Sequence, residues 1–271
     1  MQRALDLASD KGASSWLTTL PLEQHGFSLN KREFRDALCL RYAWKIKISP
    51  SYCACGAVND INHLLICKRG GYVTLRHDEL RNTGAELLKE VCHDVKVEPE
   101  LIPLTTEDLG VQANQADGAR LDISARGLWS PMERTFFDVR VTHPNAPSNR
   151  QKPLAQIYRE HEKQKKTAYN RRILEVEKST FVPLVFTTSG GMAKECAAFT
   201  KRLAEKISEK RQEKYCDTMA CIRKRLRFCI LRGTLIALRG YRGRKSSDKT
   251  IPINAVDFSL VPGIRSNDIE E

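Results

Sequence analysis

The sequence predicts an α/β fold with its core elements in the order α-β-β-β-α-β-α. Apolar residues recur at helical spacing over residues 76–91, 151–178 and 193–211. Between these segments lie short runs in which β-branched and aromatic residues alternate with polar ones, a pattern typical of half-buried strands. Pro or Gly residues separate many of these runs and favour turns. We therefore expect strands at residues 94–98, 119–123, 135–141 and 181–186.

Segments of different composition flank this core. Residues 28–42 carry Phe34, Leu38 and Tyr42 at helical spacing after a Ser or Asn capping signal. The chain after Arg244 is polar and has no periodic pattern, so we expect no regular structure there. The expected segments are a helical N-terminal part (1–50), a Cys- and His-containing part (51–72), the core (73–212), a basic amphipathic helix (213–244) and a flexible tail (245–271).

The composition is ordinary for a globular protein, but the charge is unevenly distributed. The chain has 271 residues, of which 41% are hydrophobic and 29% charged, and its net charge is +12. Residues 150–172 hold eight Lys or Arg against two Glu, and residues 218–247 hold nine Lys or Arg without an acid. Basic residues concentrated in this way favour a polyanionic partner. There is no apolar run of about eighteen residues and no leader-like start, so we expect an intracellular protein, nuclear or cytoplasmic, without membrane association.

Two aspartates stand at the polar ends of neighbouring strand patterns. Asp122 lies in the run 119–123, and Asp138 lies in the run 135–141. If the two strands are neighbours, both carboxylates lie at one place. Paired oxygen ligands are what Mg²⁺ needs when it also keeps waters and a phosphate oxygen. We therefore predict a Mg²⁺ site for phosphodiester hydrolysis; the alternative is two strand-end aspartates that face solvent.

Three cysteines and a histidine before the core predict a structural zinc site. The ligands would be Cys53, Cys55, His63 and Cys67, with Gly56 and Gly70 permitting tight turns nearby. The gap between Cys53 and Cys55 is one residue shorter than usual, so His77 is an alternative ligand. Ordinary buried cysteines are the other interpretation. The nine cysteines at irregular spacing indicate a reducing compartment rather than a disulfide framework.

The motif order resembles that of the PD-(D/E)XK restriction-like nucleases. The resemblance rests on Leu121-Asp122 in the second strand and Asp138-Val139-Arg140 in the third, within an αβββαβ core. With the preceding Cys/His cluster, the chain is also similar to the C-terminal end of site-specific non-LTR retrotransposon polyproteins, where a zinc knuckle leads into a restriction-like endonuclease. Two positions depart from the family pattern: Leu121 stands in place of proline and Arg140 in place of lysine. The second departure leaves the site without its usual lysine.

The long helix that follows offers a replacement lysine. Its apolar stripe is interrupted by His161 and Lys165, which should face the sheet. A buried ammonium needs an anionic partner, which Asp122, Asp138 or a bound phosphate could supply. A lysine moved from strand to helix is also a known variation in the resembled family. The alternatives are that Lys165 extends to solvent, or that Lys166 exchanges roles with it; otherwise Lys166 should contact backbone phosphates.

The remaining candidates lie on the two flanking helices. Glu79, in the first turn of the helix over 76–91, could complete the metal shell, although a first-turn glutamate also favours the helix dipole. Arg76 and His77 could bind phosphate at the same helix start. On the C-terminal basic helix, Arg223, Arg225 and Arg227 should contact nucleic-acid phosphates; membrane-surface binding and docking on the core remain alternatives.

These expectations combine into a metal-dependent DNA endonuclease. DNA is the expected partner, with RNA as an alternative, and no small-molecule substrate is expected; the cofactors are a catalytic Mg²⁺ and a structural Zn²⁺. The competing interpretation is a catalytically inactive nucleic-acid-binding module derived from the same kind of element, for which Arg140 in place of lysine is the supporting feature.

Overall fold

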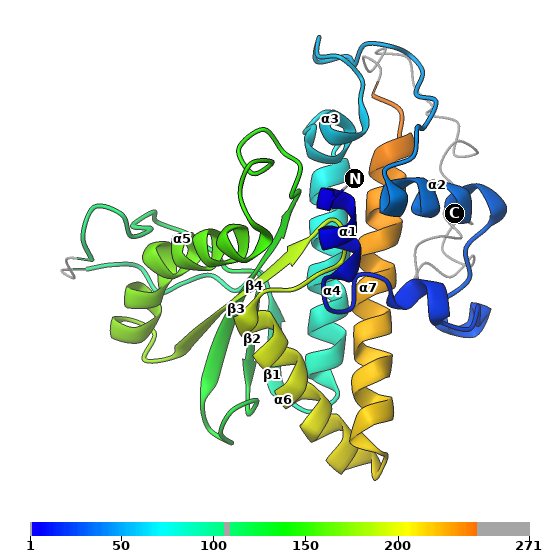
Figure 1. Ribbon diagram of the computed structural model, residues 1–271. Coiled ribbons are helices and arrows are strands. Elements are labelled where there is room, and N and C mark those ends of the chain that lie inside the picture. Colours follow the sequence, from blue (N-terminus) through cyan, green and yellow to red (C-terminus); the bar gives the residue numbers. More distant parts are fainter. Residues whose placement is uncertain (1, 106–108, 243–271) are drawn as a thin grey trace, which may run out of the picture.

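The computed structural model describes residues 2–105 and 109–242 (Figure 1). The predicted flexible tail at residues 245–271 lies outside the described residues. Within them, a four-stranded sheet is combined with seven α-helices and two short 3₁₀ helices. The elements are α1 Gln2–Ser9, η1 Ser15–Thr18, η2 Glu23–His25, α2 Lys31–Tyr42, α3 Ile61–Ile66, α4 Tyr72–Lys89, β1 His93–Val97, β2 Ile123–Arg126, β3 Arg134–Thr142, α5 Leu154–Glu175, β4 Thr180–Thr187, α6 Lys194–Arg211 and α7 Tyr215–Arg239.

The sheet is mixed, and its strands follow the chain in the order β1-β2-β3-β4. The pairs β1–β2 and β2–β3 are antiparallel, whereas β3 and β4 are parallel and are connected through α5. Pro183 is accommodated inside β4 because β4 is an edge strand. From α4 to α6 the order is αβββαβα, so the sequence predicted the succession of core elements correctly.

Helices cover both faces of the sheet (Figure 1). Alternating residues of the strands enter two different apolar clusters: Phe137 packs with residues of α4, α6 and α7, whereas Phe136 packs with Ile173 of α5. α4 approaches β2 closely at Gly84, where a Cβ atom would lie 3.3 Å from Cδ1 of Ile123. The glycine that weakens the helical pattern in sequence therefore has a packing role.

The C-terminal basic helix is part of the core, which corrects the expectation of a separate extension at 213–244. α7 lies beside α4 (Figure 1), and its residues Ile222 and Leu226 belong to the main apolar cluster. On another side, Phe228 packs against Phe27 with ring centroids 5.0 Å apart. The N-terminal part predicted at 1–50 thus packs on α7. Burial on several sides leaves α7 far less basic surface than its sequence suggests.

One strand boundary also differs from the expectation. The run 119–123 was predicted as a strand, but β2 begins at Ile123. The preceding residues pair only irregularly with residues 98–101, through an isolated bridge between Arg120 and Glu100 and through backbone hydrogen bonds such as that from the N–H of Glu98 to the carbonyl of Asp122 at 2.9 Å. Asp122 consequently lies directly before β2 instead of within it. A side chain at that point is free to turn toward the neighbouring strand.

Candidate functional site

The two predicted aspartates lie side by side because of the pairing between β2 and β3. Ile123 pairs with Phe137 in the antiparallel register. Continued by one residue, this register sets Asp122 opposite Asp138. Directly opposed residues of an antiparallel pair have Cβ atoms roughly 4.5–5.5 Å apart. Strand pairing thus brings both carboxylates to one end of β2.

Asp122 is held by a backbone donor and a histidine. Its Oδ2 accepts a hydrogen bond of 2.6 Å from the N–H of Val139 and lies 3.2 Å from Nε2 of His77. Burial and then the nearby charge of Asp138 raise the pKa of Asp122 to about 7. Burial also lowers the pKa of His77, so the imidazole that faces Asp122 is neutral at neutral pH. Two carboxyl groups in mutual repulsion are a suitable donor set for a hard cation.

Lys165 reaches the sheet from α5, as its place on the helical stripe predicted. Its Nζ forms an ion pair with Oδ2 of Asp138 and lies 5.8 Å from the ring centroid of Tyr169. Asp138 is only 6% exposed, and a carboxylate buried to this extent requires a positive neighbour. Lys165 provides that charge. The structure therefore brings Asp122, Asp138 and Lys165 together with His77.

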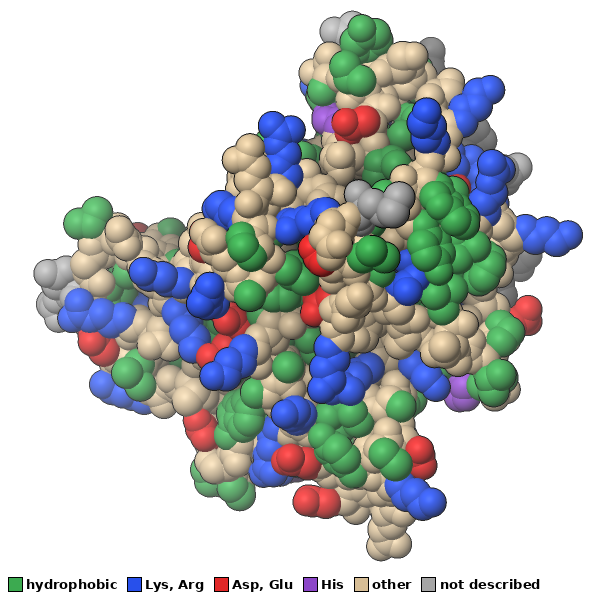
Figure 2. All heavy atoms as spheres, viewed as in Figure 1, with side chains coloured by type: hydrophobic (Ala, Val, Ile, Leu, Met, Phe, Trp, Pro, Cys, Tyr) green, Lys and Arg blue, Asp and Glu red, His purple; other side chains and the backbone are tan. Residues whose placement is uncertain are grey.

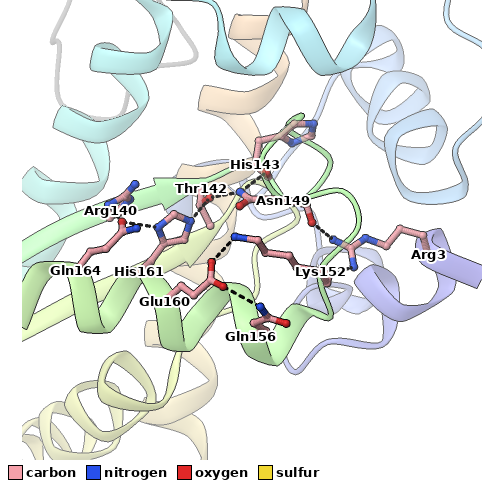
Figure 3. A network of polar contacts seen from close by, with 10 residues as sticks. All are labelled: Arg3, Arg140, Thr142, His143, Asn149, Lys152, Gln156, Glu160, His161 and Gln164. Carbon is pink, nitrogen blue, oxygen red and sulfur yellow. Dashed lines mark hydrogen bonds and ion pairs between the residues drawn. The ribbon is translucent and has the colours of Figure 1, made fainter.

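A network of polar contacts holds α5 against β3 beside Asp122, Asp138 and Lys165 (Figure 3). Arg140 donates a hydrogen bond of 3.0 Å to Gln164 Oε1, and Thr142 Oγ1 lies 3.0 Å from Nε2 of His161. His161 is buried, which lowers its pKa. These contacts position the helix turn that carries Lys165. They also explain the two polar interruptions of the α5 stripe: His161 meets a threonine and Lys165 meets a carboxylate.

α4 begins at Tyr72, before the predicted start at residue 76, so Arg76, His77 and Glu79 do not lie in its first turn. Two of these candidates also point elsewhere than predicted. Arg76 is 2% exposed and donates a hydrogen bond of 3.1 Å to the carbonyl of Leu65, so it is buried against α7 near Gly233 and is not a surface phosphate ligand. Glu79 is two residues from His77 on the helix and therefore points to another side, where its charge acts on Cys229 of α7. His77 contacts a carboxylate where a phosphate contact was predicted.

Arg81 is a site neighbour that the sequence pattern did not identify. It pairs with Asp78 at 3.1 Å and forms a second ion pair with Glu98. Its charge adds to the fall in the pKa of His77 that burial causes, and it offsets part of the rise in the pKa of Asp122 that burial and Asp138 cause. Its position one turn after His77 is the only sequence signal for this role.

The predicted phosphate ligands outside α4 are in varied environments. Arg227 is buried, which contradicts a role in surface phosphate contact, and Arg225 pairs with Glu86 and Glu90. Arg223 is half-buried. Lys166 is half-exposed and pairs with Glu195 at 2.6 Å. Arg140, on β3, faces α5 close to Asp138.

The Cys/His cluster forms as the sequence predicted. The ligand atoms of Cys53, Cys55, His63 and Cys67 all lie within 4.8 Å of one another. The sulfur atoms of Cys53 and Cys67 are 3.7 Å apart, and Sγ of Cys55 lies 3.3 Å from Nε2 of His63. Tetrahedral Zn²⁺ with Zn–S bonds of roughly 2.3 Å requires sulfur atoms roughly 3.8 Å apart. This group could hold a metal ion such as zinc, and His77, the alternative ligand, contacts Asp122 instead.

The fold presents these ligands on a short helix and a tight turn. Asp60 caps α3 by accepting a hydrogen bond of 2.6 Å from the N–H of His63, and Cys67 lies directly after the helix. Leu64 and Leu65 pack against Ala237 and Leu238 of α7. The cluster is therefore joined to the rest of the protein through apolar contacts as well as through the chain.

A neutral histidine also links α3 to the sheet. Nε2 of His143 lies 3.0 Å from Oδ1 of Asn62, and its Nδ1 lies 2.8 Å from Oγ1 of Thr188. Burial and then the charge of Arg76 lower the pKa of His143 to about 4. Asn149 donates to Thr142 Oγ1 and to the carbonyl of His143, each at 3.1 Å. It thereby connects His143 to the network of polar contacts in Figure 3.

No family model matches the chain, and no curated protein matches its sequence. Among the described residues, none of the helices combines the length and the apolar character needed to cross a membrane.

We expect Cys67→Ser to abolish zinc binding. Purified wild-type protein should carry about one Zn²⁺ per chain, because four ligand atoms already lie at tetrahedral spacing. In the variant, hydrogen exchange should accelerate over residues 51–70 while the amides of β3 stay protected. Metal analysis and exchange mass spectrometry measure both effects. Cys216→Ser, at an exposed thiol outside the cluster, is the matched control and should keep its zinc; zinc-free wild type would refute the assignment.

The raised pKa of Asp122 predicts a pH-dependent stability difference. Between about pH 4 and 7 the unfolded carboxyl is ionised while the folded one keeps its proton, so raising the pH through this window destabilises the fold. Asp122→Asn removes this effect and can still accept the bond from Val139. We expect its stability relative to wild type to increase by about 1–3 kcal/mol between pH 5 and pH 8 in buffer without added Mg²⁺. Urea unfolding measures this, and a difference that does not vary with pH would argue against the shift.

Proposed function

We propose that this protein is a Mg²⁺-dependent DNA endonuclease with a restriction-like core and a zinc knuckle. The observation that carries the proposal is the opposition of Asp122 and Asp138 across β2 and β3, with Lys165 ion-paired to Asp138. A mixed four-stranded sheet in an αβββαβα succession also supports it. An origin in the target-cleaving module of a non-LTR retrotransposon is part of the same proposal, because the Cys/His cluster precedes this core.

Asp122 and Asp138 would hold the cation in this mechanism. Bound there, Mg²⁺ would lower the pKa of a coordinated water and neutralise developing charge at the phosphate. Lys165 would orient the nucleophilic water or the scissile phosphate through Nζ, which already lies at Oδ2 of Asp138. His77 would keep Asp122 in place and accept or donate a proton at Nε2. These roles use side chains that the fold already brings together.

Arg140 stands where the resembled nucleases have their lysine. Its contacts favour a role in positioning α5 and not in the chemistry. Its guanidinium is half-buried and donates to Gln164 on α5, and burial lowers its pKa. A guanidinium keeps its proton at neutral pH and cannot serve as a general base. Lys165, one residue after Gln164, is therefore the better candidate for the position of the missing lysine.

DNA would approach over the α5 side of the sheet. On the face shown in Figure 2, Lys and Arg side chains gather over the region of α5. Arg159 and Lys163 of α5 are exposed. Phosphate contacts from such side chains supply affinity that depends on salt but not on sequence. α7 is a poorer surface for this purpose because it is largely covered.

The competing function is an inactive nucleic-acid-binding module. The observation in its favour is the Lys165–Asp138 ion pair, because a lysine that neutralises the carboxylate could replace the cation outright. The two functions differ in one respect that can be measured: only the nuclease requires a divalent ion to act on DNA.

Asp138→Asn should abolish Mg²⁺-dependent nicking of plasmid DNA while DNA affinity stays within about twofold of wild type. The lost group binds metal and does not contact the duplex, and removal of one such electrostatic group typically lowers a rate by roughly a hundredfold or more. Gel assays of nicking and fluorescence anisotropy measure the two quantities. Asp78→Asn, a partly exposed acid near His77, is the matched control. Equal nicking by wild type and Asp138→Asn, or none by wild type at any Mg²⁺ concentration, would contradict the proposal.

Lys165 and Lys166 should have separable effects. Lys165→Ala should lower the single-turnover rate on saturating DNA by roughly a hundredfold, within the usual range for acid–base groups, with an unchanged salt dependence of binding. Lys166→Ala should instead weaken binding to all sequences and flatten the salt slope by about one unit. The two neighbouring alanine substitutions control for each other. If Lys165→Ala altered only affinity and salt slope, the lysine mechanism would be wrong.

A further inference from the structure

A cavity with both polar and apolar lining lies away from the carboxylate pair. It has a volume of about 200 Å³ and lies among α1, η1, α2, the turn after β4 and α7. Its polar lining includes Arg3, Arg41 and Arg227 together with the hydroxyl-bearing Thr188 and Ser189. Trp16 and several small apolar side chains form other parts of the wall. The cavity therefore combines cationic and apolar surface.

Arg227 is the unusual member of this lining. It is 7% exposed, and its Nε and Nη1 have no hydrogen-bond partner among residues 2–105 and 109–242. No ion pair involving Arg227 is formed within that part of the chain. The guanidinium lies against the backbone of Gly190, where a Cβ atom would be 2.1 Å from Nη1. Gly190 has a φ of +92°, so both the conformation and the contact require glycine.

The guanidinium of Arg41 lines the same cavity, and no carboxylate of the described residues forms an ion pair with it. Nε of Arg41 is buried and also lacks a partner among the described residues, while its Nη1 contacts Ser14 Oγ and lies 3.4 Å from the carbonyl of Ala8. Thr234 adds a buried hydroxyl with no partner in the same part of the chain. Asp10 is engaged by the hydroxyl of Tyr158. The described residues thus supply donors to this cavity but no balancing negative charge.

Burial of uncompensated positive charge is unfavourable unless an anion is bound. Burial and then the charge of Arg41 lower the pKa of Arg227 to about 9, because both disfavour its charged form. Two guanidinium groups call for about two negative charges. A phosphate monoester carries roughly −1.5 to −2 at pH 7 and offers three acceptor oxygens. A carboxylate offers only one charge and two oxygens.

We propose that this cavity binds a small phosphate-bearing molecule, with its phosphate on Arg227 and Arg41 and its remainder against Trp16. The fork of N–H donors on Arg227 suits bidentate recognition of phosphate. Arg3 closes the cavity as part of its wall, because its own donors go to the carbonyls of Lys152 and Pro144, at 2.7 and 3.0 Å. This site is independent of the proposed nuclease function and uses none of its residues.

The test is phosphate binding by the full-length protein in zinc-replete buffer without Mg²⁺. Inorganic phosphate should raise the unfolding temperature of wild type in a saturable way, beyond the effect of chloride at equal ionic strength. Arg227→Met should weaken phosphate binding by roughly tenfold or more, because charge-assisted hydrogen bonds are lost. Without phosphate, Arg227→Met should be at least as stable as wild type, since it removes a buried unpaired charge. Calorimetric titration measures the affinities.

Matched variants and ligands make the result decisive. Lys224→Met, on the same helix but outside the cavity, should respond to phosphate as wild type does. Arg41→Gln provides a second loss of binding if Arg227→Met does not fold. Thymidine 5′-monophosphate against thymidine and inorganic phosphate distinguishes an ester from the free ion as the source of the phosphate. Equal phosphate binding by wild type, Arg227→Met and Arg41→Gln, or no saturable phosphate binding by wild type, would overturn the proposal.

Discussion

The antiparallel register between β2 and β3 is the constraint on which the candidate site depends. With Ile123 opposite Phe137, Asp122 falls opposite Asp138. A shift of this register by one residue would move one carboxylate to the other face of the sheet and bury it among the apolar side chains of α4 and α6. The same register leaves the N–H of Val139 free to hold Asp122. Pairing of two strands thus determines the position, the electrostatics and the orientation of the acidic pair.

Much of this arrangement could be predicted from the sequence because it follows from short-range periodicity. The alternation around Asp138 indicated its strand, and the helical stripe placed Lys165 toward the sheet, where it meets Asp138. The exact start of β2 could not be predicted, because the apolar pattern continues before Ile123, where the chain pairs only irregularly with residues 98–101. The role of Arg81 was also missed, since it depends on how closely α4 approaches the sheet at Gly84.

For α7 the structure favours the alternative of docking on the core over a surface that contacts nucleic acid. A basic amphipathic pattern reports that one side of a helix is apolar, but it does not report how many neighbours the helix has. Here α4, α6 and the N-terminal segment all pack on α7, and arginines in the pattern become buried. Arg232, for example, donates a hydrogen bond of 2.8 Å to the carbonyl of Ser28. Contacts between the two ends of a chain are long-range information that periodicity does not contain.

The proposed function depends most directly on the binding of a divalent ion at Asp122 and Asp138. Isothermal titration calorimetry of zinc-loaded protein with Mn²⁺, a substitute for Mg²⁺, measures it directly without requiring DNA. We expect one saturable site in wild type that is lost in Asp138→Asn, while the zinc content of both proteins stays the same. Identical Mn²⁺ binding by the two proteins, or none by wild type, would contradict it.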